Sequence, residues 1–247
     1  MKDILFKEIM KIQESISAFF PAYNDERTIG KIVEQTRKIL KEITNDFEII
    51  IIDDCSPDNC GKIGDQLSKK YKEVKVIHHK KNKGYGGVLK SGFKTATKDL
   101  IFYTDGDAQY NVTELKILIN YMVKGIDVVN GYKLYRADNL SRCVLGSLYN
   151  HFVKLVFNLK VKDVDCDFRL IRRGVFDKVK LRSNTGVICL EMMKKIQNAG
   201  FNITNVPVHH YPRVYGSSTF FNILNIIKVL IRLVNLWVEL VLFQKYR

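Results

Sequence analysis

The segment FEIIII at residues 47–52 constrains the fold of this chain more than any other feature. An unbroken run of mainly β-branched residues is typical of a strand that is buried on both faces, as the strands of parallel sheets are. Further apolar runs alternate with helical patterns, at residues 15–20, 74–79, 99–105 and 127–133. Strands that alternate with helices predict βαβ units, so the expected architecture is α/β, with a mostly parallel central sheet flanked by helices.

In the second half of the chain this alternation loosens. We expect helices over residues 139–160 and 185–200 and a last strand over 202–210. The stretch 161–173 is polar and dense in charge, and no strand is assigned to it. The chain of 247 residues shows no internal repeat and no low-complexity linker, which predicts one large domain over residues 15–219.

Two amphipathic helices are expected outside this domain, over residues 1–14 and 220–247. Eighteen of the 24 residues from 220 to 243 are apolar, and five of the six polar ones fall within an arc of about 80° at about 100° per residue. A membrane-spanning helix would expose this polar stripe to lipid, whereas a helix that lies in the membrane interface keeps the stripe in water. We therefore predict an interfacial helix. The alternative, a helix buried against the domain, requires that nearly its whole circumference be covered.

The chain carries 40 Lys and Arg residues against 26 Asp and Glu, a formal net charge of +14. Such an excess predicts an anionic partner, which is nucleic acid, an anionic membrane surface or a phosphorylated substrate. The five cysteines are odd in number and form no C-x-x-C pair, a pattern typical of reduced thiols in a cytosolic setting.

Polar clusters stand at the carboxyl ends of the expected strands, where open α/β sheets bind ligands. Asp105 and Asp107 follow the apolar run at 99–105 and are separated by a glycine. Two carboxylates in such a turn can hold one Mg²⁺ or Mn²⁺ together with the phosphates of a substrate.

Two other strand ends carry candidate nucleotide-binding groups. Asp53 and Asp54 end the strand at 47–52 and are interpreted as ligands of a base or ribose, as caps of the next helix, or as one of each. The glycine-bearing turn at residues 82–87 is either a phosphate loop or a flexible connection between strand and helix.

Together these segments resemble the family-2 glycosyltransferases of GT-A fold, and more closely the polyprenyl-phosphate sugar synthases typified by dolichol-phosphate mannose synthase. The resemblance covers about residues 15–220 and depends on six motifs that follow one another in the family's order. The motifs are P-A-Y-N-D at 21–25, D-D-C-S at 53–56, N-K-G-Y-G-G at 82–87, D-G-D-A-Q at 105–109, D-V-D-C-D-F-R at 163–169 and R-V-Y-G-S-S at 213–218.

The resemblance implies a role for each matching residue. Nucleotide binding is implied for Pro21, Ala22, Tyr23, Asp25, Asp53, Asp54, Asn82, Lys83, Gly86, Asp105 and Gly106. Metal ligation is implied for Asp105, Asp107 and Gln109, and catalytic roles for Asp163, Arg169 and Arg213. Binding of the acceptor phosphate is implied for Lys133, Arg142 and Arg169, and a loop closing over the diphosphate for Arg213, Gly216 and Ser218.

The chain also departs from the family pattern, mainly on the expected acceptor side. The residues that differ are Asp25 in place of glutamate, Lys133 in place of arginine, Gly146 in place of serine, Asp167 in place of glycine and Thr219 in place of lysine.

The activity that the resemblance implies is a metal-dependent inverting transfer of a sugar from a GDP- or UDP-sugar to dolichyl or undecaprenyl phosphate. It would take place at the cytoplasmic face of the cell membrane, and a homo-oligomer is left open. A phosphate monoester has a second pKa of about 6 and is already anionic near neutral pH, so such an acceptor needs positioning more than deprotonation.

Other functions remain to be separated from this one. A GT-A enzyme that acts on a glycan or another soluble acceptor shares the same donor half, and a membrane-surface nucleotide-sugar binder shares it without turnover. Nucleic-acid binding is indicated only by the net charge, and the acidic strand ends argue against it. A dinucleotide-dependent oxidoreductase would need a glycine fingerprint after the first strand, where this chain has Pro-Ala-Tyr-Asn.

Overall fold

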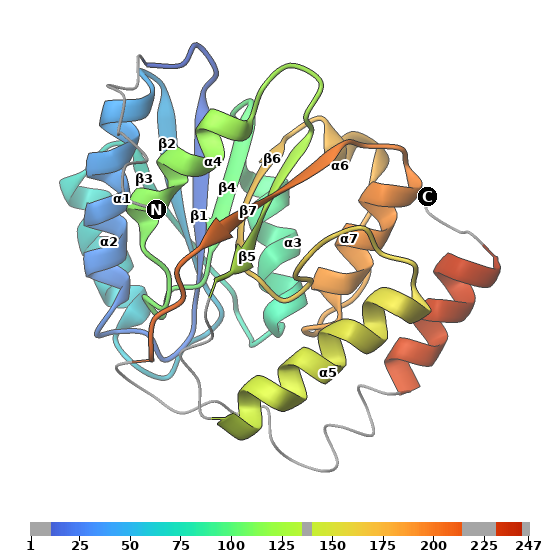
Figure 1. Ribbon diagram of the computed structural model, residues 1–247. Coiled ribbons are helices and arrows are strands. Elements are labelled where there is room, and N and C mark those ends of the chain that lie inside the picture. Colours follow the sequence, from blue (N-terminus) through green and yellow to red (C-terminus); the bar gives the residue numbers. More distant parts are fainter. Residues whose placement is uncertain (1–10, 135–139, 214–230, 244–247) are drawn as a thin grey trace.

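The computed structural model describes residues 11–134, 140–213 and 231–243. Its centre is a seven-stranded sheet of order β3-β2-β1-β4-β6-β5-β7 (Figure 1). The strands are β1 (Ile16–Ala22), β2 (Phe47–Asp53), β3 (Val74–His78), β4 (Leu100–Thr104), β5 (Val128–Lys133), β6 (Phe168–Arg172) and β7 (Ile203–Val208). Neighbouring strands are parallel except at β6, which runs antiparallel to β4 and β5. The predicted α/β architecture with a mostly parallel sheet is confirmed.

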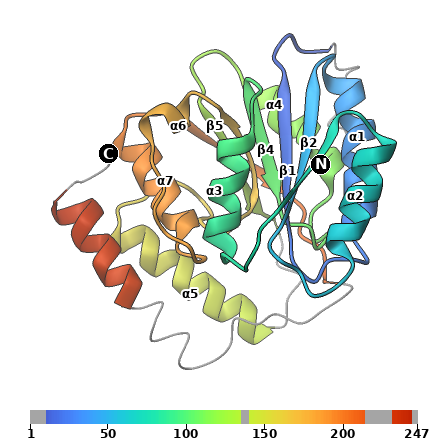
Figure 2. The ribbon, with the colours of Figure 1, turned by 180° about the vertical axis from the view of Figure 1, so that it is seen from behind.

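Helices cover both faces of the sheet (Figures 1 and 2). They are α1 (Ile29–Ile43), α2 (Cys60–Lys70), α3 (Tyr85–Thr95), α4 (Leu115–Tyr121, after the 3₁₀ turn Val112–Glu114), α5 (Leu140–Val156), α6 (Val175–Lys178) and α7 (Ile188–Asn198). A further helix, called the C-terminal helix below, covers residues 231–242, of which Val238–Leu242 is π-helical. One hydrophobic cluster lies between the sheet and α1, α2 and α4, and a second between the sheet and α3, α5, α7 and the C-terminal helix.

Strand β2 shows why its sequence is so restrictive. Ile49 and Ile51 lie in the first cluster, Ile50 and Ile52 lie in the second, and all four side chains are fully buried. The strand contacts apolar groups on both faces, as the uninterrupted β-branched run predicts.

The sequence assigns no strand to residues 161–173, and this prediction is wrong. Strand β6 occupies Phe168–Arg172 in the middle of the sheet. The charged side chain of Arg169 is fully buried, and the side chains of its sequence neighbours Phe168 and Leu170 lie in the first cluster on the opposite face of the sheet. A buried arginine looks like a surface residue in the sequence, and this concealed the strand.

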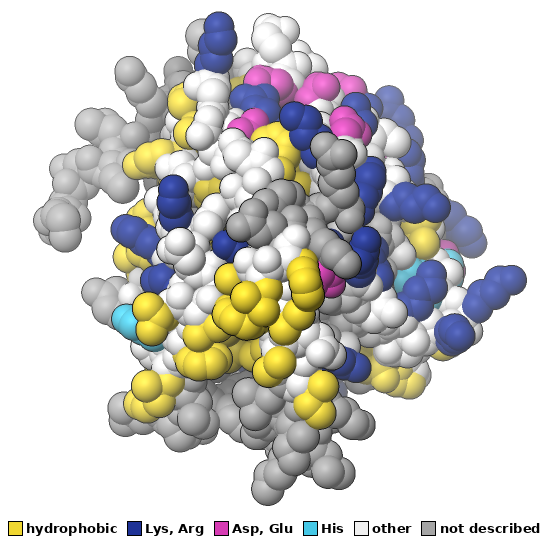
Figure 3. Space-filling model, turned by 90° about the vertical axis from the view of Figure 1, so that its right-hand side faces the viewer, with side chains coloured by type: hydrophobic (Ala, Val, Ile, Leu, Met, Phe, Trp, Pro, Cys, Tyr) yellow, Lys and Arg dark blue, Asp and Glu magenta, His cyan; other side chains and the backbone are white. Residues whose placement is uncertain are grey.

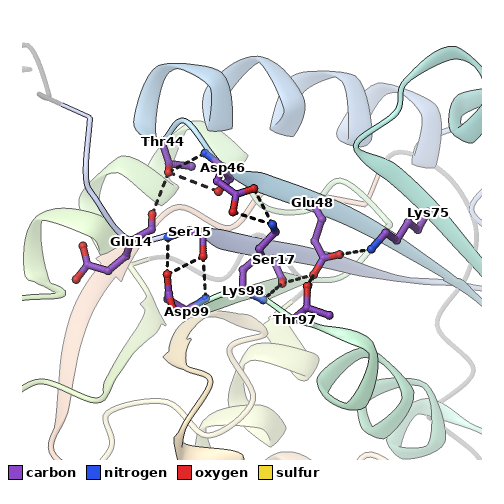
Figure 4. A network of polar contacts seen from close by, with 10 residues as sticks. All are labelled: Glu14, Ser15, Ser17, Thr44, Asp46, Glu48, Lys75, Thr97, Lys98 and Asp99. Atoms are coloured by element: carbon purple, nitrogen blue, oxygen red, sulfur yellow. Dashed lines mark hydrogen bonds and ion pairs between the residues drawn. The ribbon is translucent and has the colours of Figure 1, made fainter.

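A buried polar network holds the amino-terminal edge of the sheet (Figure 4). Glu48 of β2 is almost fully buried and accepts hydrogen bonds from Ser17 Oγ at 2.7 Å, Lys75 Nζ at 2.7 Å and Thr97 N at 2.8 Å. Burial alone would raise the pKa of Glu48, but the bonds from Lys75, Ser17 and Thr97 outweigh it and lower this pKa to about 2. The network therefore ties β1, β2, β3 and the start of β4 together at the edge away from the candidate site.

The C-terminal helix packs one face on the domain. Leu233, Leu236 and Leu240 are buried in the second cluster, and Trp237 Nε1 donates a hydrogen bond to the Val156 carbonyl of α5 at 3.0 Å. The domain thus covers part of this helix and leaves another part exposed, an arrangement between the two alternatives considered from the sequence. Among the described residues, no helix is both long enough and apolar enough to cross a membrane.

The helix predicted over residues 1–14 falls mostly outside the described residues. Of its last part, Ile12 forms an isolated parallel bridge to Thr44 at the end of α1.

Candidate active site

The carboxyl ends of β1 and β4 place two sequence motifs side by side. The two strands are parallel neighbours, so the turn after Ala22 and the turn after Thr104 meet at the same edge of the sheet. Gly106 sits so close to β1 that a Cβ there would lie 2.6 Å from the Pro21 carbonyl oxygen, and its own carbonyl accepts a 2.6 Å hydrogen bond from Thr28 Oγ1. The glycine between the two aspartates is therefore required by the contact between these turns.

Asp105 is the first residue after β4, where the turns that follow β1 and β4 meet. Its Oδ1 accepts a hydrogen bond from the hydroxyl of Tyr85, the first residue of α3, at 2.9 Å. Burial raises the pKa of Asp105 well above its usual range, the negative charges of Asp167 and Asp107 raise it further, and the Tyr85 hydrogen bond opposes them. A cation beside Asp105 would relieve both the burial cost and the repulsion.

Asp107 is joined to a residue 106 positions later in the sequence. Its Oδ2 lies 2.6 Å from Arg213 Nη2, and its Oδ1 accepts the Gln109 amide hydrogen bond at 3.0 Å. Gln109 binds the same segment, because its Nε2 donates to the Tyr211 carbonyl at 3.1 Å. The structure thus brings Arg213 to the acidic motif; Gly216 and Ser218 lie outside the described residues.

Asp25 completes the acidic group at this edge. Its Oδ2 accepts a hydrogen bond from the amide of Tyr23 at 3.2 Å, and Tyr23 itself is exposed. Burial raises the pKa of Asp25 to about 6, with Asp107 adding to the increase and the Tyr23 amide and Arg213 opposing it.

Asp53 and Asp54 bind protein groups. Asp53 Oδ1 accepts the Ser56 amide at 2.9 Å, and its Oδ2 lies 2.8 Å from His78 Nδ1. Asp54 lies 2.6 Å from Nδ1 of the buried His79 and accepts the amides of Lys83 and Gly84 at 2.8 and 3.0 Å. Asp54 thus fixes the start of the glycine-bearing turn.

The glycines of that turn are needed for contact with the loop before α7. Gly84 has φ +74°, and a Cβ on Gly86 would lie 2.4 Å from the Ser183 carbonyl oxygen. The amide of Gly86 donates to the Asn184 carbonyl at 3.1 Å. The turn therefore holds Tyr85 against Asp105 through backbone packing, and at Gly86 the amide is already used by the protein.

Arg169 is fully buried beneath the site. Its Nε donates to Asn130 Oδ1 at 2.7 Å, its Nη1 donates to the Tyr103 hydroxyl and lies 3.2 Å from Asp167, and its Nη2 donates to the Val164 carbonyl. These contacts give Arg169 a positioning role for the 163–167 turn. A guanidinium with no exposed surface does not contact an acceptor in this conformation.

The other residues expected on the acceptor side surround the same turn. Asp163 is buried, and its Oδ1 accepts the Asp165 amide at 3.0 Å. Lys133, at the end of β5, donates from Nζ to the Asp165 carbonyl at 2.9 Å. Arg142 lies in the first turn of α5, and its side chain is outside the described residues.

Two residues that act on Asp105 have no predicted role from the sequence. They are Tyr85, whose hydroxyl donates to Asp105, and Asp167, whose negative charge raises the pKa of Asp105. Tyr85 occupies a variable position of the glycine turn motif, so only the register of α3 shows that its hydroxyl reaches Asp105. Asp167 stands where the family has glycine, which is a signal in the sequence, but its effect on Asp105, 62 positions away, depends on the fold.

These side chains fit a divalent cation held jointly with a ligand. The described residues contain no group of three or more His, Cys, Asp or Glu side chains arranged as a complete metal cage. Mg²⁺ or Mn²⁺ binds one or two protein carboxylates when substrate phosphates supply the remaining oxygen ligands. Asp105 and Asp107 can supply these two carboxylates.

The sequence profile of glycosyl transferase family 2 matches residues 17–180, which include β2 through β6, all of β1 except its first residue, and the site aspartates Asp25, Asp105 and Asp107. The chain belongs to this family. It is therefore a glycosyltransferase, and the resemblance inferred from the six motifs is confirmed.

Curated relatives of this family-2 glycosyltransferase share about a quarter of its residues. Undecaprenyl-phosphate 4-deoxy-4-formamido-L-arabinose transferase of Yersinia enterocolitica is 25% identical over 230 residues, which are 92% of this chain and 67% of the relative. Glycosyltransferase AglD of Haloferax volcanii is 27% identical over 208 residues, which are 80% of this chain and 33% of the relative. The chain thus spans a third to two thirds of these proteins.

Solved structures confirm the GT-A fold. Glucosyl-3-phosphoglycerate synthase from Mycobacterium tuberculosis, crystallised with Mn²⁺, UDP and phosphoglyceric acid, superposes with a TM-score of 0.67 and 14% identity, covering 92% of this chain and 78% of the synthase. A structure of the same enzyme with Mg²⁺ and UDP gives a TM-score of 0.68 and 12% identity, over 92% of this chain and 79% of the other.

Proposed function

We propose that this glycosyltransferase moves a sugar from a nucleotide-sugar, with GDP or UDP as the leaving group, to a polyprenyl phosphate at a membrane surface. Binding of the nucleotide-sugar donor is supported by one observation. Asp105, Asp107 and Arg213 lie together beside the turn that begins at Pro21. The acceptor class is supported by the Yersinia relative, whose name specifies undecaprenyl phosphate.

The charges at the site favour a divalent cation as part of the donor complex. Arg213 pairs with Asp107, whereas Asp105 is bonded to the neutral hydroxyl of Tyr85 and faces the charges of two other aspartates. A diphosphate that approaches this edge meets carboxylates, so its binding needs added positive charge. Asp105 and Asp107, with Gln109 beside them, would hold Mg²⁺ or Mn²⁺, which would neutralise charge developing on the leaving diphosphate.

The chain's own residues would then align donor and acceptor. Arg213, on the segment after β7, is placed to give the diphosphate charge-assisted hydrogen bonds. Lys133 and Arg142 are the candidates for holding the acceptor phosphate, with Arg169 and Asp163 shaping the turn that Lys133 contacts. The phosphate nucleophile is already anionic, so inversion at the anomeric carbon depends on alignment more than on a base.

Two features support a reaction at a membrane surface: the lipid nature of the proposed acceptor and the exposed apolar part of the C-terminal helix. Ile231, Val234, Leu242 and Phe243 are exposed on that helix, and the chain has a net charge of +14. Nucleotide-sugars and anionic lipids meet at the cytoplasmic face, where basic residues add to adhesion. We therefore place the reaction there.

The test is turnover with GDP- and UDP-sugars, Mg²⁺ or Mn²⁺, and a short-chain polyprenyl phosphate, with glycolipid as the product. Asp107→Asn should lower turnover by at least about a hundredfold, since it removes a carboxylate that neutralises the metal and pairs with Arg213. Asp46→Asn is the matched control, because Asp46 pairs with Lys98 at the opposite edge of the sheet (Figure 4). Full turnover in the Asp107 variant refutes the metal assignment, and product formed only on a soluble glycan or a small phosphorylated acceptor refutes the acceptor class.

A further inference from the structure

Helix α5 carries an apolar stripe that faces solvent. The side chains of the stripe are Val144, Leu148, Phe152 and Leu155, which are 53%, 62%, 53% and 83% exposed. At about 100° per residue they fall within an arc of about 80°. The opposite side of the helix packs on the second hydrophobic cluster, through Tyr149, Val153, Val156 and Phe157. A helix that is apolar on both sides has the pattern of a helix that is covered on both sides.

The C-terminal helix continues this surface. It lies against α5, because Trp237 donates its hydrogen bond to the Val156 carbonyl. Ile231 and Val234 on it are 57% and 61% exposed. Figure 3 looks onto the side where the two helices lie in Figure 1 and shows hydrophobic side chains gathered into one area in its lower half. An apolar surface that extends over two neighbouring helices marks an interaction site.

The charge around the stripe indicates the kind of partner. Residues 140–162, which form α5 and the segment after it, contain no Asp or Glu and four basic residues, Arg142, Lys154, Lys160 and Lys162. Lys160 and Lys162 are exposed. Apolar side chains flanked by lysines and without carboxylates complement a bilayer that carries anionic headgroups.

The stripe also lies near the active-site edge of the sheet. Strands β4 and β5 are both antiparallel to β6 and therefore run in the same direction. The end of β5, from which the chain proceeds to α5, is thus on the same edge as Asp105 at the end of β4. A lipid surface that covers α5 would place headgroup phosphates beside Lys133, which ends β5.

We propose that α5 is a membrane-docking element, and that its stripe enters the acyl region of an anionic bilayer next to the C-terminal helix. The choice of a bilayer as occupant rests in part on the proposed function, through the lipid acceptor. The surface charge supports it independently, since a second copy of this chain would bring like charges together.

Flotation with phosphatidylcholine vesicles, with and without an equimolar share of phosphatidylglycerol, tests the proposal without donor or acceptor. Leu148→Gln/Leu155→Gln should lower the partition coefficient on the anionic vesicles at least about tenfold, because two exposed leucines no longer enter the lipid. Tyr121→Gln/Val123→Gln is the matched control: these side chains are 50% and 56% exposed at the end of α4, on the other face of the sheet. Equal flotation of the α5 variant and the wild type overturns the proposal.

A second measurement reports insertion directly. The chain has one tryptophan, Trp237, so Trp237→Phe combined with Phe152→Trp gives a single reporter on the stripe. Brominated lipids should quench it, and should not quench the same background with Tyr121→Trp. An unquenched reporter, with a concentration-dependent dimer that Leu148→Gln abolishes, assigns the stripe to a second copy and overturns the proposal.

Turnover on a short, water-dispersed polyprenyl phosphate separates the two hypotheses. Flotation that is lost in the α5 variant while this turnover is retained supports docking and leaves the function intact. Wild-type flotation with no turnover on any polyprenyl phosphate refutes the proposed function alone.

Discussion

Replacing Tyr85 with phenylalanine should weaken metal binding at the acidic site. The Tyr85 hydroxyl donates a 2.9 Å hydrogen bond to Asp105, whose pKa burial and the charges of Asp167 and Asp107 already raise well above its usual range. Without the hydroxyl this pKa rises further. A divalent cation must displace the proton from the carboxyl before it binds, so a more tightly held proton means a lower apparent affinity.

The expected loss of Mn²⁺ affinity follows from the charge on Asp105, which accepts the hydrogen bond from Tyr85. A hydrogen bond to a charged group contributes about 1.5–3 kcal/mol, and about 1.4 kcal/mol corresponds to a factor of ten. We therefore expect Tyr85→Phe to lower the apparent Mn²⁺ affinity at neutral pH by about ten- to a hundredfold. The pKa of Asp105 is raised, so affinity falls as the pH decreases in both proteins, and the curve of the variant lies at higher pH.

The measurement is calorimetric titration of Mn²⁺ with UDP or GDP present, over a neutral to alkaline pH series. Tyr71→Phe is the control, because it removes a hydroxyl that bonds the carboxylate of Glu34 at the protein surface, 3.2 Å away. It should leave the titration unchanged. If Tyr85→Phe binds Mn²⁺ as tightly as the wild type at every pH, the assigned role of Tyr85 is wrong.

Three predictions concern stability, each measured by chemical denaturation. Glu48→Gln should lower the free energy of unfolding by about 3 kcal/mol at neutral pH, because folding lowers the pKa of Glu48 from 4.5 to about 2. The difference in stability between wild type and variant should persist above pH 4.5 and disappear as the pH falls toward 2. Gly86→Ala should cost about 1–3 kcal/mol, because its Cβ would meet a carbonyl oxygen at 2.4 Å; an unchanged midpoint would contradict that packing. Lys195→Met should lower the free energy of unfolding by about 3–5 kcal/mol, because the buried carboxylate of Glu191 loses its charged partner and keeps the amides of Arg182 and Ser183; an unchanged free energy would contradict this.

The parallel part of the fold was predictable because each strand is an apolar run with a polar end. The run at 47–52 became β2, and its consecutive isoleucines alternate between the two core clusters. The antiparallel strand β6 was not predictable in the same way. The charge of Arg169 is compensated by Asp167 and by hydrogen bonds to Asn130 and Tyr103, and the fold alone brings Asn130 and Tyr103 to it from 39 and 66 positions away.

The order of the sequence motifs predicted which distant residues of the acidic site lie close together. Asp107 and Arg213 lie 106 positions apart, and the motifs alone placed them in one site. The glycine turn shows the limit of that reasoning, because glycine marks a close approach of backbone without naming the approaching group. In this chain the group at Gly86 is the backbone of residues 183–184, where a phosphate had been one of the two alternatives.

Asp54 and Arg169 show that a residue of a matched motif can be fully engaged by contacts within the protein. Asp54 accepts hydrogen bonds from two turn amides, and the fully buried guanidinium of Arg169 donates to a carbonyl and to two side chains. A buried charge keeps its partners because breaking such a pair costs several kcal/mol. Substitution of either residue would therefore disturb the site by moving the 82–87 or 163–167 turn, and loss of activity in such a variant is not evidence that the residue touches substrate.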